Sequence, residues 1–331
     1  MIPLFYLMAL TGTGGGCGQR LEGYAEARRC AGVRPGMAQT EGMFEGWSAD
    51  TGPARGRPVE NGPDPVLGLA LGGGGARGLC HIGVVRVLEE LTIRPDVVSG
   101  TSMGGLIGAF IAAGYTAEQM AEIATDLRWS KLIDWSPISG RLVNTKGFER
   151  WLVELLPATF EELELPLVLT ATDLNDGRIH YSQRGDLITA LRATTAYPGA
   201  LEPVRLGRAR LVDGGLLNQI PVDGALFLGA HKVLAVNATP LVRVDHPADD
   251  AGAPRRRIRM TALHELMRAV DVMQAQLTMA RLSFYKPDVL LDTPMEGLDI
   301  ADFHRAKHAI DAGEAAAREH REELLSLITA G

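Results

Sequence analysis

Apolar runs and amphipathic segments alternate along the chain from residue 64 onward. Four apolar runs have the length of buried strands, at 66–71, 96–99, 165–172 and 232–236. The segment 82–91, between the first two runs, carries apolar residues at helical spacing. A strand, a helix and a second strand in this order predict a βαβ unit, which is right-handed by default.

The alternation continues to the end of the chain, with a hairpin turn predicted at Asn175-Asp176-Gly177. The further elements that we expect are a helix at 186–195, a strand at 210–212, a helix at 261–284, a strand at 288–291 and a helix at 300–327. This order predicts an α/β fold with a mainly parallel central sheet and helices on both faces. We expect one domain over 64–331, made of a core at 66–238, a polar linker at 240–259 and C-terminal helices with a strand at 261–331.

Residues 1–63 are rich in Gly, Pro, Arg, Glu and Ala and lack a sustained hydrophobic period. We expect a disordered leader there, or sequence upstream of the true start. The first ten residues are apolar and precede Cys17, which loosely resembles a lipoprotein signal. Because no Lys or Arg precedes this short run, we do not expect export or lipid anchoring at Cys17.

The chain of 331 residues has a formal net charge of −7, with 46% hydrophobic and 22% charged residues. This balance argues against a general nucleic-acid-binding protein but leaves local apolar contact with a membrane open. The cysteines Cys17, Cys30 and Cys80 form no disulfide framework and suit a reducing compartment, so we expect a cytoplasmic protein. The sequence holds no Cys-x-x-Cys or His-Glu-x-x-His pattern, and we expect neither a metal nor a cofactor.

The segment Gly100-Thr101-Ser102-Met103-Gly104 follows a β-prone run and precedes a helix of small residues. The pattern Gly-x-Ser-x-Gly is typical of a sharp strand-to-helix turn that exposes a serine hydroxyl. Gly100 and Gly104 leave room for the turn and for a substrate, and the N-terminus of the helix favours an oxyanion nearby. An isolated copy of the pattern is common, so Ser102 is a candidate nucleophile that needs a base and an oxyanion receptor.

The segment Gly73-Gly74-Gly75-Ala76-Arg77-Gly78 follows the first strand and opens a helix. Successive glycines let backbone N–H groups turn towards one point, which predicts an oxyanion receptor. Two alternatives stay open: a tight turn without a ligand, and a dinucleotide-binding site that uses Gly73, Gly75 and Gly78. The dinucleotide site needs an acidic residue at the end of the second strand, whereas Asp96 stands at its start.

Asp213 follows a short β-type run and precedes Gly214 and Gly215, so its carboxylate can approach a substrate as a base. A simple Asp-Gly turn is the alternative. A Ser–Asp–His triad would instead need a histidine after Asp213. The candidates, none of them in a compelling setting, are His231, His246, His264, His304, His308 and His320. His81 is expected to pack within the helix that follows the glycine loop.

These three motifs, in this order and spacing, resemble the signatures of the patatin-like phospholipase family. The segments 170–177 and 193–199 resemble its bacterial members in particular. The resemblance implies a three-layer α/β/α patatin-like fold and a Ser–Asp dyad without histidine. In that dyad Ser102 is the nucleophile and Asp213 the general base.

The same resemblance implies oxyanion donors at Gly73, Gly74 and Gly75, with Arg77 holding their loop. The implied substrates are lipid acyl esters, cleaved through an acyl-enzyme by a carboxylic ester hydrolase of the phospholipase A, lysophospholipase or lipid esterase type. Peripheral membrane contact would accompany that activity. The natural lipid, the positional preference, the acyl-chain length and the oligomeric state stay open.

Overall fold

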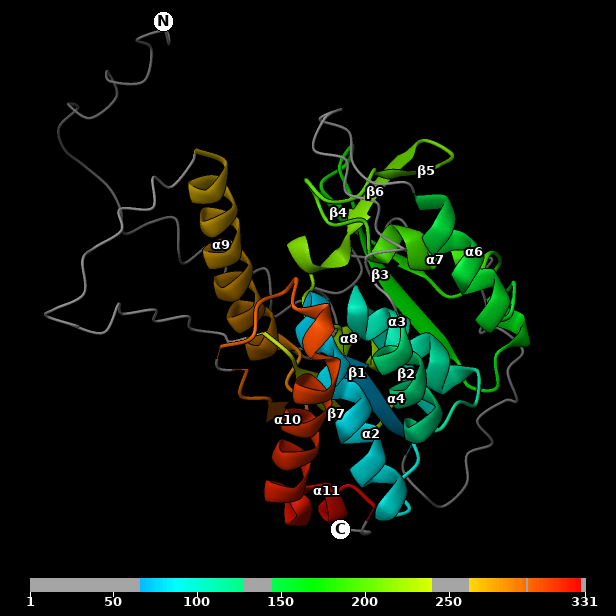
Figure 1. The fold of residues 1–331 in the computed structure, drawn as a ribbon, viewed down its shortest axis with the longest axis vertical. Helices are drawn as coiled ribbons and strands as arrows, with labels where there is room; N and C mark the ends of the chain where they lie inside the picture. The colour runs from blue at the N-terminus through cyan, green and yellow to red at the C-terminus, as the bar shows by residue number, and fades with distance from the viewer. Residues whose placement is uncertain (1–65, 128–144, 240–261, 296, 329–331) are drawn as a thin grey trace, which may run out of the picture. The chain divides into compact units, whose positions relative to one another are not determined.

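A mixed, mainly parallel sheet forms the centre of the protein (Figure 1). The computed structural model describes residues 66–127, 145–239, 262–295 and 297–328, which all belong to one compact unit within Pro53–Gly331. The predicted leader at 1–63 and linker at 240–259 lie outside the described residues. Among those residues, no helix is both long and apolar enough to cross a membrane.

The sheet has the strand order β5-β6-β3-β2-β1-β7-β8, and β4 pairs with β3. The strands are β1 (Leu67–Leu71), β2 (Val97–Thr101), β3 (Leu167–Asp173), β4 (Arg178–Ser182), β5 (Val204–Leu206), β6 (Ala209–Asp213), β7 (Lys232–Asn237) and β8 (Val289–Asp292). Pairing is parallel from β3 through β2, β1 and β7 to β8, and antiparallel between β3 and β4, β3 and β6, and β5 and β6.

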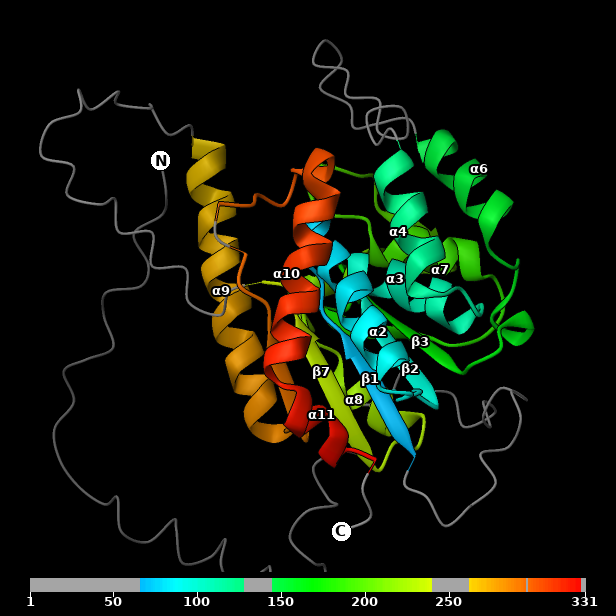
Figure 2. The same ribbon diagram turned by 60° about the horizontal axis from the view of Figure 1, so that its bottom comes forward.

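Helices cover both faces of the sheet, which gives the predicted three layers (Figure 2). They are α2 (Cys80–Glu90), α3 (Met103–Ala112), α4 (Ala117–Asp126), α6 (Thr145–Leu155), α7 (Leu187–Thr194), α8 (Val222–Phe227), α9 (Ala262–Phe284), α10 (Ala306–Glu319) and α11 (Arg321–Ser326). The short strand β1 shows why the two faces differ. Leu67, Leu69 and Leu71 enter the large core under α2, α3, α4 and α10. Ala70 enters the smaller core under α8. Gly68 lies on the same face of β1, where a Cβ would collide with the Ala225 side chain.

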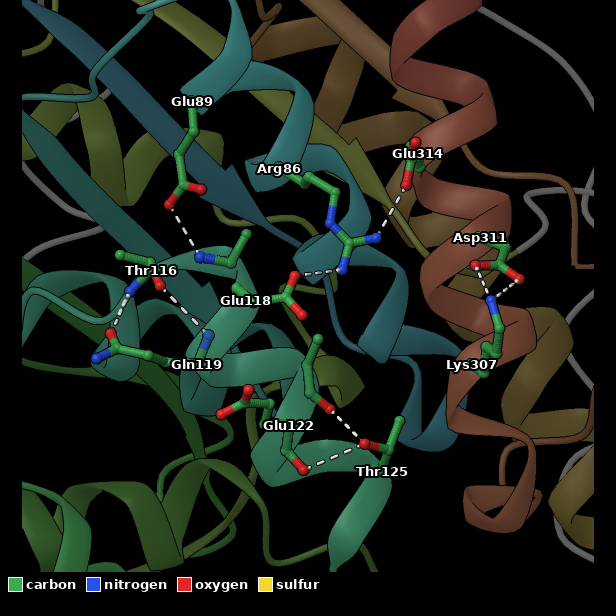
Figure 3. A network of polar contacts seen from close by, with 12 residues as sticks. Arg86, Glu89, Thr116, Glu118, Gln119, Glu122, Thr125, Lys307, Asp311 and Glu314 are labelled. Atoms are coloured by element: carbon green, nitrogen blue, oxygen red, sulfur yellow. Dashed lines mark hydrogen bonds and ion pairs between the residues drawn. The ribbon is translucent and has the colours of Figure 1, made fainter.

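The outer helices α2, α4 and α10 are joined by a network of charges around Arg86 (Figure 3). The Arg86 guanidinium contacts Glu118 of α4 at 3.3 Å and Glu314 of α10 at 2.9 Å. α4 begins with a capping box, in which Thr116 and Gln119 exchange side-chain-to-backbone hydrogen bonds. These contacts tie α2, α4 and α10 to one another on one face of the sheet.

The two strands that lead to Ser102 and Asp213 end against the same edge of β3. β4 pairs along one edge of the second half of β3, so β2 and β6 share the other edge. β2 runs parallel to β3 and places Thr101 beside Thr170, whereas β6 runs antiparallel and places Asp213 beside Ala171. Because Thr170 and Ala171 are consecutive, β2 and β6 meet end to end where the candidate site lies.

Most predicted elements are present, and the differences have local causes. β5 was not predicted because three residues, Val204-Arg205-Leu206, are too short to show a period. α6 lies in a segment for which no element was predicted. The single helix predicted at 300–327 is instead a 3₁₀ turn (Phe303–Arg305) followed by α10 and α11. The break falls at His320, which caps α10 and begins α11.

Candidate active site

Ser102 stands at the turn between β2 and α3 in a strained backbone conformation. Its φ of 54° and ψ of −125° lie outside the regions that non-glycine residues favour. The Ser102 amide donates a hydrogen bond to the Thr194 Oγ1 at 2.8 Å, and the Ser102 carbonyl accepts from Leu106 in the first turn of α3. Such support is what holds a serine in the exposed position of a nucleophile elbow.

The glycines on either side of Ser102 are required by close backbone packing. A Cβ on Gly100 would overlap the backbone of Gly105, and a Cβ on Gly104 would overlap the Leu71 carbonyl. Gly104 therefore lets α3 start directly against the end of β1. The consequence is that the glycine loop following β1 lies beside Ser102.

Asp213 contacts Ser102 directly. The Ser102 Oγ donates a hydrogen bond of 2.6 Å to the Asp213 Oδ2, and the Gly215 amide donates one of 2.8 Å to the Asp213 Oδ1. The Asp213 side chain is only 4% exposed. Burial raises the pKa of Asp213 to about 6, against the opposing effect of both hydrogen bonds. A carboxylate with this pKa is a stronger base than an exposed aspartate, yet is still largely ionised at pH 7.

The glycine loop lies against Ser102 but does not direct every amide towards it. A Cβ on Gly73 would lie 3.3 Å from the Ser102 Cβ, which shows how close the two loops are. The Gly73 amide, however, donates to the Gln219 carbonyl at 3.0 Å, so this expected oxyanion donor is already engaged. Within the described residues, the amides of Gly74 and Gly75 donate to no protein acceptor. These two N–H groups are available to a ligand.

Arg77 is buried beneath the loop and binds it to the C-terminal part of the chain. Its Nε donates to the Leu298 carbonyl at 2.7 Å, and the neighbouring Ala76 amide donates to the Ile300 carbonyl at 2.8 Å. Gly78, the residue after Arg77, packs so closely on α3 that a Cβ there would lie 2.6 Å from the Met103 Cγ. The glycine loop is thus held on two sides.

No described histidine bonds to Ser102 or Asp213. His81 is buried, and its Nε2 donates to the Gly72 carbonyl at 2.8 Å. Burial lowers the pKa of His81 to about 4, so the ring is neutral. Its hydrogen bond to the Gly72 carbonyl supports the glycine loop where the loop begins. Of the histidines after Asp213, His246 and the side chain of His264 lie outside the described residues.

Sequence reasoning missed a buried polar cluster beneath the Asp213 loop. Arg281 of α9 forms a 2.6 Å ion pair with Asp223 and donates from Nε to the Asn218 Oδ1 at 3.1 Å. The Asn218 side chain also donates to Asp223, and the Tyr181 hydroxyl donates to the same carboxylate. The Asn218 carbonyl accepts from the Thr101 hydroxyl at 2.8 Å, directly before Ser102. Nothing local in the sequence around Arg281 indicates this partner.

The surroundings of the glycine loop do not match a dinucleotide site. β2 ends at Thr101 and the serine elbow, where such a site has its acidic residue. Asp96 instead accepts a hydrogen bond from the Leu67 amide at 2.7 Å, at the opposite end of the parallel strands. Among the described residues, no group of three or more histidine, cysteine or acidic side chains could hold a metal ion.

The fold and the site together define an α/β protein in which a serine at a strand-to-helix elbow faces a buried carboxylate and a glycine-rich loop. Residues 69–226, which contain all three features, match the family model described as patatin-like phospholipase. Over this stretch, which is about half of its length, the chain is similar to the patatin-like phospholipase family.

Relatives of the chain carry names of the same kind. An uncharacterized NTE family protein of Mycobacterium tuberculosis is 26% identical over 337 aligned positions, covering 79% of this chain and 92% of the relative. Patatin-like phospholipase domain-containing protein 6 of Homo sapiens is 32% identical over 184 positions, covering 52% of this chain and 13% of that protein. Lysophospholipase nte1 of Aspergillus fumigatus is 30% identical over 179 positions, covering 52% and 12%. The likeness to the two eukaryotic proteins is therefore confined to a small part of longer chains.

Proposed function

We propose that this protein is a serine acyl hydrolase that cleaves lipid acyl esters, with Ser102 as the nucleophile and Asp213 as the general base. The observation that carries the proposal is the 2.6 Å hydrogen bond from the Ser102 hydroxyl to the buried Asp213 carboxylate. A serine hydroxyl is a weak nucleophile until a base accepts its proton, and this hydrogen bond supports Asp213 as that base.

The reaction proceeds in two halves. The Ser102 Oγ attacks the ester carbonyl carbon while its proton passes to Asp213, and the carbonyl oxygen becomes an oxyanion. The amides of Gly74 and Gly75 and the N-terminus of α3 stabilise that charge. The intermediate collapses, the C–O bond to the alcohol breaks, and the alcohol takes the proton from Asp213. Water then attacks the acyl carbon as Asp213 accepts its proton. The bond from the acyl carbon to the Ser102 Oγ breaks, the fatty acid leaves, and the Oγ takes the proton back from Asp213.

The substrate class is inferred from the family and from the names of its members. The family is described as patatin-like phospholipase, and one relative is named a lysophospholipase. We therefore propose a carboxylic ester of a phospholipid, a lysophospholipid or another acyl lipid as the substrate.

The proposal is tested with the full chain and three substrates: a short-chain p-nitrophenyl ester, a lysophospholipid and a diacyl phospholipid. Ser102→Ala and Asp213→Asn should each abolish hydrolysis, and a fluorophosphonate probe should label the wild type but not Ser102→Ala. Ser283→Ala, at an exposed serine of α9, is the matched control and should keep full activity. Hydrolysis by purified Ser102→Ala at the wild-type rate would refute the proposed nucleophile.

A further inference from the structure

The hairpin formed by β5 and β6 carries a cluster of arginines that the proposed reaction does not use. Arg205 and Arg210 stand directly opposite each other on the two strands, and Arg208 lies in the turn between them. Like charges at opposite positions of an antiparallel pair destabilise the pair. All three side chains are exposed, and none has an ion-pair partner in the part of the chain that the structure describes. The hairpin therefore holds an uncompensated group of positive charges.

The three arginines surround a hollow of about 270 Å³. Asn175 also lines it and donates from its side chain to the Arg208 carbonyl at 2.6 Å, which fixes the turn. Among the described residues, no acidic side chain lines the hollow. The hollow thus offers guanidinium groups and an amide to an anion, and guanidinium matches the geometry of a phosphate.

The acidic residues of the neighbourhood do not neutralise this cluster. Asp173 is buried, and its Oδ1 accepts hydrogen bonds from the amides of Asn175 and Arg210 at 2.9 and 3.0 Å. Asp176 and Glu202 are exposed, and neither forms an ion pair with a described residue.

Two large apolar side chains lie beside the arginines. Leu206 and Leu174 are each 45% exposed, although leucine is a residue that folding usually buries. Leu206 directly follows Arg205 on β5, so its side chain leaves the opposite face of the hairpin from the paired Arg205 and Arg210. The Leu174 amide donates to the Arg210 carbonyl at 2.9 Å, so the hairpin carries arginines and exposed leucines together. Exposed leucines next to exposed arginines are typical of surfaces that bind the headgroup region of a bilayer. We call Leu174, Arg205, Leu206, Arg208 and Arg210 the hairpin surface.

The hairpin surface lies at the end of the sheet where the candidate active site is found. β6 runs from the hairpin directly into Asp213, and Arg210 precedes Asp213 by three residues, a rise of about 10 Å along a strand. Figure 1 shows β4, β5 and β6 at the top, beyond the ends of the central strands. A bilayer that touched the hairpin would therefore present its headgroups close to Ser102.

We propose that the hairpin surface docks the protein on an anionic lipid bilayer, with the arginines binding lipid phosphate groups and the leucines entering the headgroup boundary. This inference rests on the proposed function, because it names the surface from which the acyl ester reaches Ser102. A bilayer accounts for both the charges and the leucines, whereas a soluble polyanion accounts only for the charges.

The test measures binding of the full chain to vesicles of phosphatidylcholine alone and of phosphatidylcholine with 30% phosphatidylglycerol. Ser102→Ala serves as the background, so that the vesicles stay intact. The protein should prefer the anionic vesicles, and the triple variant Arg205→Gln/Arg208→Gln/Arg210→Gln should bind them on the order of a hundredfold more weakly, since each basic residue contributes about fivefold. Leu174→Ser/Leu206→Ser should weaken binding as well.

The matched control is Arg94→Gln/Arg150→Gln/Arg321→Gln, which removes the same charge from exposed arginines on other elements. It should bind anionic vesicles as tightly as the parent chain. If both triple variants bound anionic vesicles equally weakly, the weakening would depend on net charge alone, and the proposal would be overturned. So would binding of inorganic phosphate that depends on the hairpin arginines without any binding of vesicles.

Activity separates this proposal from the proposed function. With Ser102 present, the hairpin triple variant should cleave a soluble p-nitrophenyl ester at the wild-type rate and hydrolyse vesicle lipids more slowly. Wild-type chain that cleaves the soluble ester but binds anionic vesicles no better than neutral ones would refute the docking surface and leave the hydrolase intact. Vesicle binding by a chain with no esterase activity would refute the hydrolase alone.

Discussion

The Gly73 amide donates a hydrogen bond to the Gln219 carbonyl over 3.0 Å and so ties the glycine loop to the loop that follows Asp213. The Gln219 side chain continues this link, since its Nε2 donates to the Thr239 Oγ1, which in turn donates to the Gly73 carbonyl. The carboxylate and the two available amides therefore belong to loops that are held together. Movement of one loop would displace the other.

The first prediction concerns the pH dependence of hydrolysis. Because the Asp213 carboxyl must be ionised to accept a proton and burial raises its pKa to about 6, kcat/KM should fall as the pH drops below about 6. The measurement is a pH profile with a soluble ester between pH 4 and 8. Substitution of the exposed histidines, His304→Gln and His308→Gln, should leave the acid limb where it is. Loss of this limb in either variant would point to a histidine base.

The second prediction concerns stability. The folded-state pKa of Asp213 lies above the ordinary value of 3.8, so the folded chain binds more protons than the unfolded chain between about pH 4 and pH 6. The free energy of unfolding attributable to this group therefore falls as the pH rises through that window. Asp213→Asn should be more stable than the wild type at pH 8, by about 1–3 kcal/mol, and the difference should vanish near pH 4.

Urea denaturation of both proteins at pH 4, 6 and 8 measures this difference. Asp176→Asn, which removes the same charge from an exposed turn, is the control. If the free energy of unfolding varied with pH in the same way for the wild type and Asp213→Asn, burial would not raise the pKa of this carboxyl.

The third prediction concerns the glycine loop. Gly75 has a φ of 55°, and a Cβ there would overlap the Ile300 carbonyl, which accepts the Ala76 amide. Gly75→Ala should therefore displace the Gly74 and Gly75 amides and lower kcat on the order of tenfold to a hundredfold. Gly229→Ala is the matched control, because Gly229 also has a positive φ, of 93°, but faces open space. Its kcat should equal that of the wild type, and equal losses in both variants would exclude an effect specific to the loop.

The fourth prediction concerns the ion pair between Arg281 and Asp223, whose side chains are 12% and 2% exposed. Arg281→Met leaves a buried carboxylate without its partner and should destabilise the fold by about 3–5 kcal/mol. Asp223→Asn in the same chain should recover part of that loss. Urea denaturation of the two single variants and the double variant gives the coupling free energy. A coupling near zero would show that the pair does not hold α9 to α8.

Local patterns in the sequence were sufficient to predict the α/β architecture and to indicate Ser102, Asp213 and the glycine loop as candidates, whereas the pairing of Ser102 with Asp213 was implied only by the resemblance of the three motifs to a known family. The adjacency of the glycine loop and Ser102 follows from the βαβ unit, because the carboxyl ends of neighbouring parallel strands meet at one edge of a sheet. The turn chemistry around Ser102 is equally local: a strained elbow between a strand and a helix needs small residues on both sides.

Only the tertiary structure decided how Asp213 reaches Ser102, which is 111 residues earlier in the chain. Asp213 arrives on an antiparallel strand that meets β2 end to end, because β4 occupies the opposite edge of β3. The tertiary structure also decided that the Gly73 amide is hydrogen-bonded within the protein, that Arg281 forms an ion pair, and that β5 is a strand. Each of these features depends on a partner segment that is distant in the sequence. Hydrophobic period and turn chemistry indicate the conformation and burial of a residue, but they do not indicate which distant segment packs against it.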